Sequence, residues 1–332
     1  MPKRTAPPYE PPAHQLALFP EVSGNTVNGL GETERRQPTP IYWHYGWDLP
    51  HKELQDYYLK QFDDKPELKD FDKKYGGRGP KLPPQRPERP VEDTPENFSA
   101  RVKAYALANE AELVGIARVN QDWVFEGYEV KEPWIIMLGV AMDHEKLAKA
   151  PEIESPIEVM TQYNRGTRAA RALANLIQSL GYNARPHGGP MAGPLLLIPP
   201  AVECGMAELG KHGSLINGTY GSSFRLAGVL ADLPLIGDAP DEIAVDEFCA
   251  SCRVCTSACP PDAIFNEKQS VRGVTKWFVD FDKCIPYFND TQGCGICIAV
   301  CPWSRPGTAP KLAEKMVAKR ARRGANGRVT TG

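Results

Sequence analysis

The sequence predicts an α+β protein with α/β-like alternation, followed by a small cysteine-rich module. Segments with helical periodicity alternate with short apolar segments between residues 96 and 240. Eight of the nine cysteines follow residue 241, and half of the 32 prolines precede residue 96. We therefore expect four parts: an N-terminal arm (1–95), a core domain (96–240), a cysteine-rich module (241–310) and a C-terminal tail (311–332).

The arm is expected to contain few helices or strands, because proline ends helices and removes strand hydrogen bonds. Its stretch 41–50, IYWHYGWDLP, nevertheless carries four aromatic residues. Disordered tails are poor in aromatic residues. We therefore predict that the arm is ordered by lying on the core domain, with a linker holding a chance aromatic cluster as the alternative.

The core domain is expected to begin with a helix that Thr94 caps and Pro95 opens. A second helix is predicted over 155–182, with Ser155 as its cap, Pro156 in its first turn and Gly181 at its end. Apolar, β-branched runs predict the strands. The remaining expected elements are strands at 113–117, 133–142, 183–186 and 194–198 and a helix at 199–211.

The module opens with the motif Cys249-x2-Cys252-x2-Cys255-x3-Cys259-Pro260. This is the bacterial-ferredoxin spacing for a [4Fe–4S] cluster, in which the fourth cysteine binds a second cluster. A zinc site needs only two cysteine pairs. Structural disulfides are disfavoured because nothing else in the sequence suggests secretion.

A second motif, Cys294-x2-Cys297-x3-Cys301-Pro302, supplies the second cluster. Thr291 stands where a regular repeat would place its first cysteine, so we expect Cys284 to replace it. The outer cysteines are expected to exchange between the clusters. Cluster one then takes Cys249, Cys252, Cys255 and Cys301, and cluster two takes Cys259, Cys284, Cys294 and Cys297. The remaining Cys204 is expected to be a small core residue.

Several classes of protein are disfavoured. The net charge of −2 gives no general attraction to nucleic acid. No apolar run reaches the ~18 residues of a membrane span, and the first residues lack a secretory h-region. No dinucleotide fingerprint or P-loop is present. Reduced thiols suit the cytoplasm. The basic tail is expected to be a frayed solvated helix, or else a docking site for an acidic electron-transfer partner.

Four stretches resemble one known family: ELVGIARVNQDWVF (112–125), QYNRGTRAARALANLIQSLGYNAR (162–185), AELGKHGSLINGTYGSSFRLAGVLADLPL (207–235) and the cysteine motifs ending in CPWSRPG. The family is the cobalamin-dependent reductive dehalogenases, with epoxyqueuosine reductase as a more distant likeness. The resemblance covers about residues 110–307. It implies a nitroreductase-like core that binds base-off cobalamin, and two [4Fe–4S] clusters that pass electrons inward to cobalt.

In such enzymes Co(I) attacks the carbon–halogen bond or the halogen, and a tyrosine beside a basic residue supplies the proton. These residues correspond to Tyr163 and Arg225. A phenol, with an ordinary pKa of about 10, keeps its proton at neutral pH. Arginine keeps its charge and stabilises the phenolate. The alternatives are a surface tyrosine and a surface ion-pair arginine.

Two glycine-rich loops, 185–193 and 214–223, are candidates for cobalamin contact because glycine lets backbone approach a large flat ring. Coordination of cobalt by the histidine among them is not expected, because the family leaves that face of the corrinoid free. A hydrophobic substrate pocket is expected from four aromatic residues, with core packing as the commoner alternative. The cobalamin candidates are His187, Gly188, Gly189, Leu215, Ile216, Asn217 and Gly218, and the pocket candidates are Trp43, Tyr45, Trp47 and Trp303.

The absence of a twin-arginine leader points to the cytoplasmic, catabolic type, which acts on halogenated phenols and hydroxybenzoates. The chain carries no fused reductase, so an external ferredoxin or flavin reductase is expected as electron donor. We expect no nucleic-acid partner. Two alternatives stay open: an epoxyqueuosine-reductase-like enzyme acting on tRNA, and a non-catalytic Fe–S electron carrier.

Overall fold

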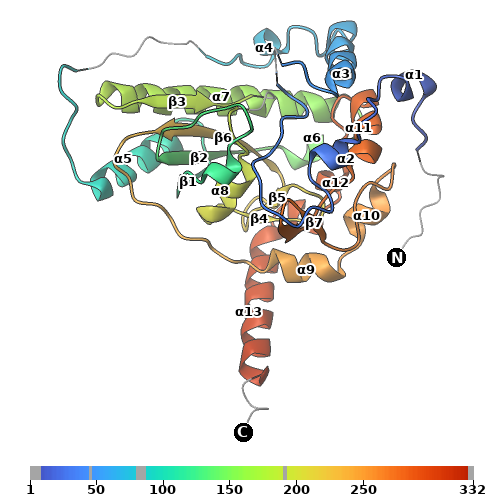
Figure 1. Cartoon of the computed structure of the whole chain (residues 1–332). Coiled ribbons are helices and arrows are strands. Elements are labelled where there is room, and N and C mark those ends of the chain that lie inside the picture. Colours follow the sequence, from blue (N-terminus) through green and yellow to red (C-terminus); the bar gives the residue numbers. More distant parts are fainter. Residues whose placement is uncertain (1–8, 45–46, 80–86, 190–192, 328–332) are drawn as a thin grey trace.

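A four-stranded antiparallel sheet lies at the centre of the structure (Figure 1). The computed structural model describes residues 9–44, 47–79, 87–189 and 193–327. The strands lie in the order β1-β2-β6-β3, and each pairs antiparallel with its neighbour. Their bounds are β1 Leu113–Arg118, β2 Trp134–Ala141, β6 Phe224–Ala231 and β3 Ala184–His187.

Strand β6 is inserted between two strands that precede it in the chain. Because β2 and β3 both run antiparallel to β6, they run parallel to each other. The helices α6 (His144–Leu147) and α7 (Glu154–Ser179) connect them. The sequence analysis did not predict β6, although this strand joins the two halves of the sheet.

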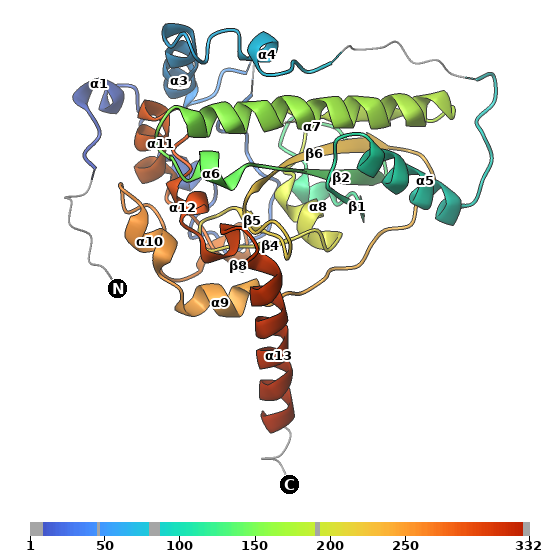
Figure 2. The ribbon, with the colours of Figure 1, turned by 180° about the vertical axis from the view of Figure 1, so that it is seen from behind.

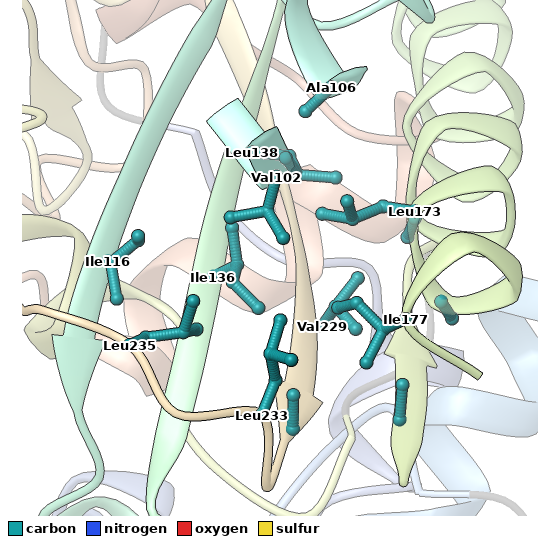
Figure 3. Packing of buried hydrophobic residues seen from close by; sticks show 14 of the residues in the cluster. Val102, Ala106, Ile116, Ile136, Leu138, Leu173, Ile177, Val229, Leu233 and Leu235 are labelled. Atoms are coloured by element: carbon teal, nitrogen blue, oxygen red, sulfur yellow. The ribbon is translucent and has the colours of Figure 1, made fainter. Parts of the chain in front are cut away.

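The long helix α7 covers one face of the sheet together with α5 (Pro95–Ala108) (Figure 1). Successive residues of a strand point to opposite faces. Ile136, Leu138 and Val229 point toward α7, where they pack against Leu173 and Ile177 (Figure 3). The intervening strand residues pack on the opposite face around α8 (Ile198–Glu203).

One of the two expected helix caps, Thr94, is confirmed, and the other, Ser155, is wrong. Thr94 caps α5, since its hydroxyl accepts a hydrogen bond from the Asn97 amide at 3.2 Å. Helix α7 begins at Glu154, slightly before the expected start, and no side chain caps it. Ser155 is buried within its first turn instead.

The region after β3 differs from the prediction. Instead of a strand at 194–198, a single bridge pairs Leu195 with Val124, and α8 begins at Ile198. The predicted helix at 199–211 is much shorter, because Gly205 adopts φ +71° where a Cβ would lie 2.5 Å from the Ala239 carbonyl oxygen. A two-stranded ribbon follows, formed by β4 (Glu208–Leu209) and β5 (Leu215–Ile216).

The N-terminal arm is more helical than expected. Its helix α3 (Lys52–Asp64) buries an apolar face that includes Leu54, Tyr58 and Phe62. Three single-turn helices accompany it: α1 (Ala13–Leu16), α2 (Gly24–Val27) and α4 (Phe71–Lys74). In Figures 1 and 2 most of these helices gather around α11 (Phe281–Asp290) of the cysteine-rich module. The arm therefore lies on the module as well as on the core domain.

Two neighbouring residues of α11 anchor the arm. Asn289 is fully buried, and its Oδ1 accepts a hydrogen bond from the Tyr42 hydroxyl at 2.9 Å. The Asp290 carboxylate accepts hydrogen bonds from the Tyr9 hydroxyl and the Gln15 amide, both at 2.5 Å. These contacts join residues at opposite ends of the chain.

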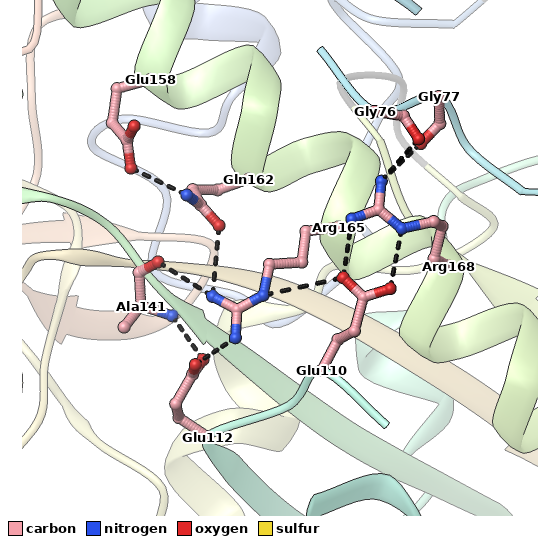
Figure 4. A network of polar contacts seen from close by, with 9 residues as sticks. All are labelled: Gly76, Gly77, Glu110, Glu112, Ala141, Glu158, Gln162, Arg165 and Arg168. Atoms are coloured by element: carbon pink, nitrogen blue, oxygen red, sulfur yellow. Dashed lines mark hydrogen bonds and ion pairs between the residues drawn. The ribbon is translucent and has the colours of Figure 1, made fainter. Parts of the chain in front are cut away.

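A polar network fixes α7 against the start of the sheet (Figure 4). Arg168 forms a two-pronged ion pair with Glu110, at 2.7 and 2.6 Å, and donates to two carbonyls of the arm. Arg165 pairs with Glu112, whose other oxygen accepts from the Ala141 amide of β2 at 2.8 Å. Paired guanidinium and carboxylate groups hold a fixed geometry, so the network sets where the middle of α7 lies.

The cysteine-rich module consists of short elements followed by one long helix. The N-terminal end of helix α13 (Ala309–Gly327) packs on the module. The rest of the helix projects from the body of the protein in both views (Figures 1 and 2). Among the described residues, every helix is too short or too polar to span a bilayer. The other elements are α9 Val245–Ser251, α10 Val254–Ala258, β7 Gln269–Val271, β8 Val274–Lys276, α12 Ile296–Ala299 and the 3₁₀ turn Pro302–Ser304.

Truncation of Leu173 to alanine is expected to lower the free energy of unfolding by about 2–5 kcal/mol, because it leaves a cavity between α7 and the sheet. Leu107→Ala on α5 is the matched control, since that side chain is 54% exposed. It should change stability by no more than about 0.5 kcal/mol. Chemical denaturation followed by circular dichroism measures both. Equal losses in the two variants would contradict the packing described here.

Candidate active site

The eight cysteines of the module form two sets that cross the order of the motifs. Burial chiefly raises the pKa of Cys249 to about 12, and the nearby Cys301, Cys255 and Cys252 add to the rise. Burial likewise raises the pKa of Cys301 to about 12, with Cys255 and Cys252 contributing. Cys301, from the second motif, therefore lies among the first three cysteines of the first motif.

The second set is built in the same way. Burial raises the pKa of Cys284 to about 12, and Cys294 and Cys259 contribute. Burial raises the pKa of Cys297 well above the ordinary value, and Cys294, Cys284, Cys255 and Cys259 add to the rise, so Cys297 also lies near a thiol of the first set. Apart from that contact, these neighbours follow the grouping that the spacing predicts. Which thiols bind which cluster stays a prediction.

The donor chemistry of both sets suits iron–sulfur clusters. The thiols are buried or nearly so, and backbone amides point at two of the sulfurs. The Lys211 amide donates to Cys249 Sγ at 3.5 Å, and the Ala263 amide donates to Cys259 Sγ at 3.4 Å. Such bonds stabilise thiolate and tune cluster potential. In the described part of the chain, no three ligand-type side chains converge closely enough for one metal ion.

Cys204 stands apart from both sets. It is 6% exposed and packs beneath the sheet with Ala201 and Met206. A Cβ on Gly115 of β1 would lie 2.5 Å from its sulfur, so the thiol fills the space that this glycine leaves. The structure places Cys204 in the core, as the sequence analysis expected.

A cavity of about 500 Å³ lies beside the second thiol set. Its walls combine the module, the loop before α8, the β4–β5 ribbon and the arm. Among the described lining residues, three are basic (Arg225, Arg272 and Lys276), and none is acidic. Its size falls in the range of about 300–1,000 Å³ typical of cofactor and ligand pockets. All four thiols of the second set line it: Cys259, Cys284, Cys294 and Cys297.

Arg225 and Tyr163 meet at the edge of this cavity. The Arg225 guanidinium carbon lies 5.3 Å from the centroid of the Tyr163 ring, within the range of a cation–π interaction. Arg225 lines the cavity, and its buried Nε has no hydrogen-bond partner among the described residues. Tyr163 packs behind it and is not among the described lining residues. The structure therefore brings together the two residues that the resemblance singled out.

Strand alternation and helix packing explain this contact. Arg225 shares the parity of Ala227 and Val229 on β6, so it points toward α7. Gly166 of α7 sits over Ala227, and a Cβ there would lie 3.3 Å from the alanine Cβ. Tyr163 lies one helical turn before Gly166, on the same side of α7. The close approach at Gly166 thus sets Tyr163 over Arg225.

The predicted cobalamin contacts lie away from this cavity. His187 ends β3, with Nε2 buried and without a partner among the described residues. Gly188 and Gly189 pack on Thr167 of α7. Leu215 and Ile216 form β5 in the core, Asn217 accepts the Thr219 amide at 2.7 Å, and Gly218 faces Ile243. The neighbouring Leu209, His212 and Gly213 line the cavity instead.

The predicted substrate aromatics are scattered. Trp43 packs edge-on against Tyr58, and Trp47 stacks on Tyr128 at 4.8 Å. Trp303 is fully buried beside Phe248, so it takes the core role that was the alternative. Tyr45 lies outside the described residues.

Several cavity residues were missed by the sequence analysis. Tyr42 and His44 line the cavity from the aromatic stretch in which the alternate residues Trp43 and Tyr45 had been chosen. The composition of that stretch pointed to the right segment but could not give its orientation. Arg272 and Lys276 carry no motif, and only the shortness of the surrounding strands could have drawn attention to them.

Comparisons with known proteins place this site in context. A 4Fe–4S dicluster domain model matches residues 248–304. A tetrachloroethene reductive dehalogenase of Desulfitobacterium hafniense is 32% identical over 211 residues, which cover 59% of this chain and 37% of the relative. An epoxyqueuosine reductase of Cyclobacterium marinum is 35% identical over 122 residues, covering 32% of this chain and 36% of that protein.

The fold is also that of a solved reductive dehalogenase. The catabolic reductive dehalogenase NpRdhA, in complex with 3-bromo-4-hydroxybenzoic acid, matches with a TM-score of 0.68 at 24% identity. The match covers 90% of this chain and 46% of NpRdhA. The resemblance seen in the sequence is thus confirmed: the chain is homologous to reductive dehalogenases and spans less than half the length of these relatives.

His212 lines the cavity as a buried neutral imidazole. The Ser214 amide donates to its Nδ1 at 3.2 Å, which leaves Nε2 to donate to the Ser222 hydroxyl at 3.0 Å. That hydroxyl in turn donates to the Leu215 carbonyl at 2.6 Å. Burial lowers the pKa of His212 to about 4. The network needs the neutral ring, because a protonated Nδ1 could not accept the amide.

Stability should therefore fall as pH drops. The unfolded histidine takes up a proton near pH 6.5, whereas folded His212 resists protonation down to about pH 4, so the stabilising contribution is complete above pH 6.5 and lost between these values. His212→Gln is expected to remove up to about 3 kcal/mol of that dependence. Denaturant midpoints from pH 7 to pH 4 measure it. The exposed His14→Gln variant is the control, and a wild-type slope retained in His212→Gln would contradict the assignment.

Proposed function

We propose that this chain is the catalytic part of a reductive dehalogenase. The observation that carries the proposal is the Arg225 guanidinium 5.3 Å from the Tyr163 ring centroid, at the edge of a cavity that four cysteine thiols line. Homology to tetrachloroethene reductive dehalogenases supports it. The overall reaction replaces a halogen on carbon by hydrogen, consumes two electrons and one proton, and releases halide.

The cavity suits a corrinoid. Its walls are largely apolar, including Leu196, Ile198 and Val279, and their cationic groups can meet the polar edge of a large flat ring. Arg225 offers an unpartnered buried N–H there. A bound corrinoid in the base-off form would supply the strongly reducing cobalt centre that cleaves the carbon–halogen bond.

The two thiol sets would hold two [4Fe–4S] clusters. The second set lines the cavity, so its cluster would be the inner one, and the first set would hold the outer cluster. Electrons would enter at the outer cluster from an external ferredoxin or flavin reductase. This order gives each cysteine motif a part in both clusters.

Tyr163 is the proposed proton donor, with its phenolic Oη as the source of the proton. Arg225 would hold the phenol in place and then stabilise the phenolate, because its charge persists at any physiological pH. Arg225 lines the cavity and Tyr163 is not among its described lining residues, so a side-chain movement would bring the phenol to the cavity for proton transfer.

A halogenated aromatic, such as a halophenol or halohydroxybenzoate, is the proposed substrate class. The solved complex of NpRdhA contains a bromohydroxybenzoic acid, which supports this class. The cationic cavity without acidic residues among its described lining also favours a substrate carrying a phenolate or carboxylate.

An epoxyqueuosine reductase is the second candidate, favoured by the identity to the Cyclobacterium marinum enzyme. Such an enzyme would use a carboxylic acid as proton donor. The described lining of the cavity offers Arg225 and Tyr42 but no carboxylic acid. Halide release against activity on tRNA separates the two candidates, and a protein that binds iron but no corrinoid would be an electron carrier.

The crossed thiol sets predict an unusual pattern of variants. Cys252→Ser and Cys301→Ser should perturb the same electron paramagnetic resonance signal, although they lie in different motifs. Cys297→Ser, close to Cys301 in sequence, should perturb the other signal. The experiment uses anaerobically reconstituted protein, with about eight iron per chain expected in the wild type.

Cys204→Ser is the control and should keep both signals. If Cys301→Ser and Cys297→Ser perturbed the same electron paramagnetic resonance signal, the two sets would not be crossed and the proposed arrangement would be contradicted. Iron content distinguishes a lost cluster from a merely altered one.

Tyr163→Phe should lower the rate of halide release by about 10²- to 10⁴-fold, the usual contribution of a positioned proton donor. Iron and cobalt content should stay unchanged. Tyr182→Phe, on the exposed end beyond α7, is the matched control and should keep wild-type turnover. Halide release is followed by ion chromatography with a 3-halo-4-hydroxybenzoate. Near-full activity of Tyr163→Phe with intact cofactors would remove Tyr163 from the mechanism.

A further inference from the structure

The cavity has a second cationic region besides Arg225. Arg272 and Lys276 both line it from the hairpin of β7 and β8. The charged groups that affect the pKa of Arg272 are Arg36, Glu32 and Glu126. The charge of Arg225, in contrast, affects the pKa of Tyr58, which lies near Tyr163. Arg225 stands on β6 of the central sheet, whereas Arg272 and Lys276 belong to the β7–β8 hairpin of the module, so these cations line the cavity from different elements.

The hairpin is held rigidly in place. Val271 pairs with Val274, so Arg272 and Gly273 form a two-residue turn, both with positive φ, at +49° and +71°. The arm fixes this turn, because the Arg272 amide donates to the Gly29 carbonyl at 3.1 Å and the Gly273 amide to the Glu32 carbonyl at 3.1 Å. The Arg272 guanidinium donates to the Asn28 carbonyl at 3.0 Å. Only part of its donor set is used by this contact.

Lys276 is the less compensated of the two cations. Its side chain is partly buried, and no described carboxylate offsets its charge. Burial, and then the neighbouring Arg272, lower the pKa of Lys276 to about 8. Two cations of one hairpin at a cavity wall, where Arg272 lowers the pKa of Lys276, form a site that an anionic group would complete.

We propose that Arg272 and Lys276 bind the phosphodiester group of the nucleotide tail of the corrinoid. This inference rests on the proposed function. A phosphodiester carries a permanent charge and paired oxygens, which suit one guanidinium and one ammonium group. A haloaromatic carboxylate is the competing source of an anion. It would have to lie within one ring of the reacting carbon, near Tyr163 and Arg225, whereas a nucleotide tail reaches far from the corrin ring.

The test compares cobalamin with cobinamide, which keeps the corrin ring but lacks the nucleotide tail and its phosphodiester. Lys276→Met, in protein with reconstituted clusters, should weaken cobalamin binding by about 10- to 100-fold, as loss of a charge-assisted bond does. Its affinity for cobinamide should stay within about twofold of wild type. Arg272→Gln should act in the same direction. Equilibrium dialysis with absorbance detection measures both ligands and requires no turnover.

Lys268→Met is the matched control. Lys268 directly precedes the same hairpin but pairs with Asp246 at 2.7 Å and does not line the cavity. Its affinities for both corrinoids should equal those of the wild type. A Lys276→Met variant that binds cobalamin normally, or that loses both corrinoids equally, would overturn the phosphodiester assignment.

Two further outcomes distinguish a failure of this inference from a failure of the proposed function. If Lys276→Met weakens binding of 4-hydroxybenzoate while cobalamin binding is unchanged, the anion is the carboxylate of a substrate, and the inference fails while the proposed function stands. If wild-type protein with intact clusters binds neither cobalamin nor cobinamide, the proposed function itself fails, and the inference fails with it.

Discussion

The close approach of the two cysteine motifs is the constraint on which the rest of the structure depends. Cys301 lies near Cys249 of the first motif, and Cys259 lies near Cys284, so neither cysteine loop can reach its final shape alone. Helix α11 carries Cys284, and the arm is anchored on that same helix through Asn289 and Asp290. The arm and the module in turn form much of the cavity wall. The positions of the cysteine thiols are thereby coupled to the wall of the cavity, which the arm, the core domain and the module form together.

Charge is distributed unevenly around that cavity. Its described lining holds Arg225, Arg272 and Lys276 without an acid, while Glu110 and Glu112, which are not among that lining, pair with arginines of α7. Cations at a partly apolar wall are costly unless a ligand completes them. The fold tolerates this cost in free energy at the cavity, where a ligand would bind. Elsewhere it pairs arginines with carboxylates, as it does for Arg165 and Arg168. The arrangement is typical of a binding site that is formed before its ligand arrives.

The sequence predicted local features better than spatial ones. Cysteine spacing predicted both thiol sets because ligand geometry is encoded within a few residues, and Thr94 marked a helix start for the same reason. The contact of Tyr163 with Arg225 came from family resemblance; its physical basis, the parity of β6 and the close approach at Gly166, needs the register of the sheet. Strand β6 was missed because its central place depends on pairing with β2 and β3. The residues predicted to contact cobalamin are not among the described lining of this cavity, because glycine content indicates backbone freedom but not direction, and their contact with cobalamin stays a prediction.

The arm has a consequence for how the molecule assembles. The Tyr9 hydroxyl binds a carboxylate 281 positions further along the chain. Contacts of such long range form late, because the entropy of closing the loop must be overcome before they contribute. During synthesis the arm emerges before helix α11, so it has no docking surface until the module has been made. Docking of the arm on the module is therefore a late step of folding, which requires that α11 has already formed.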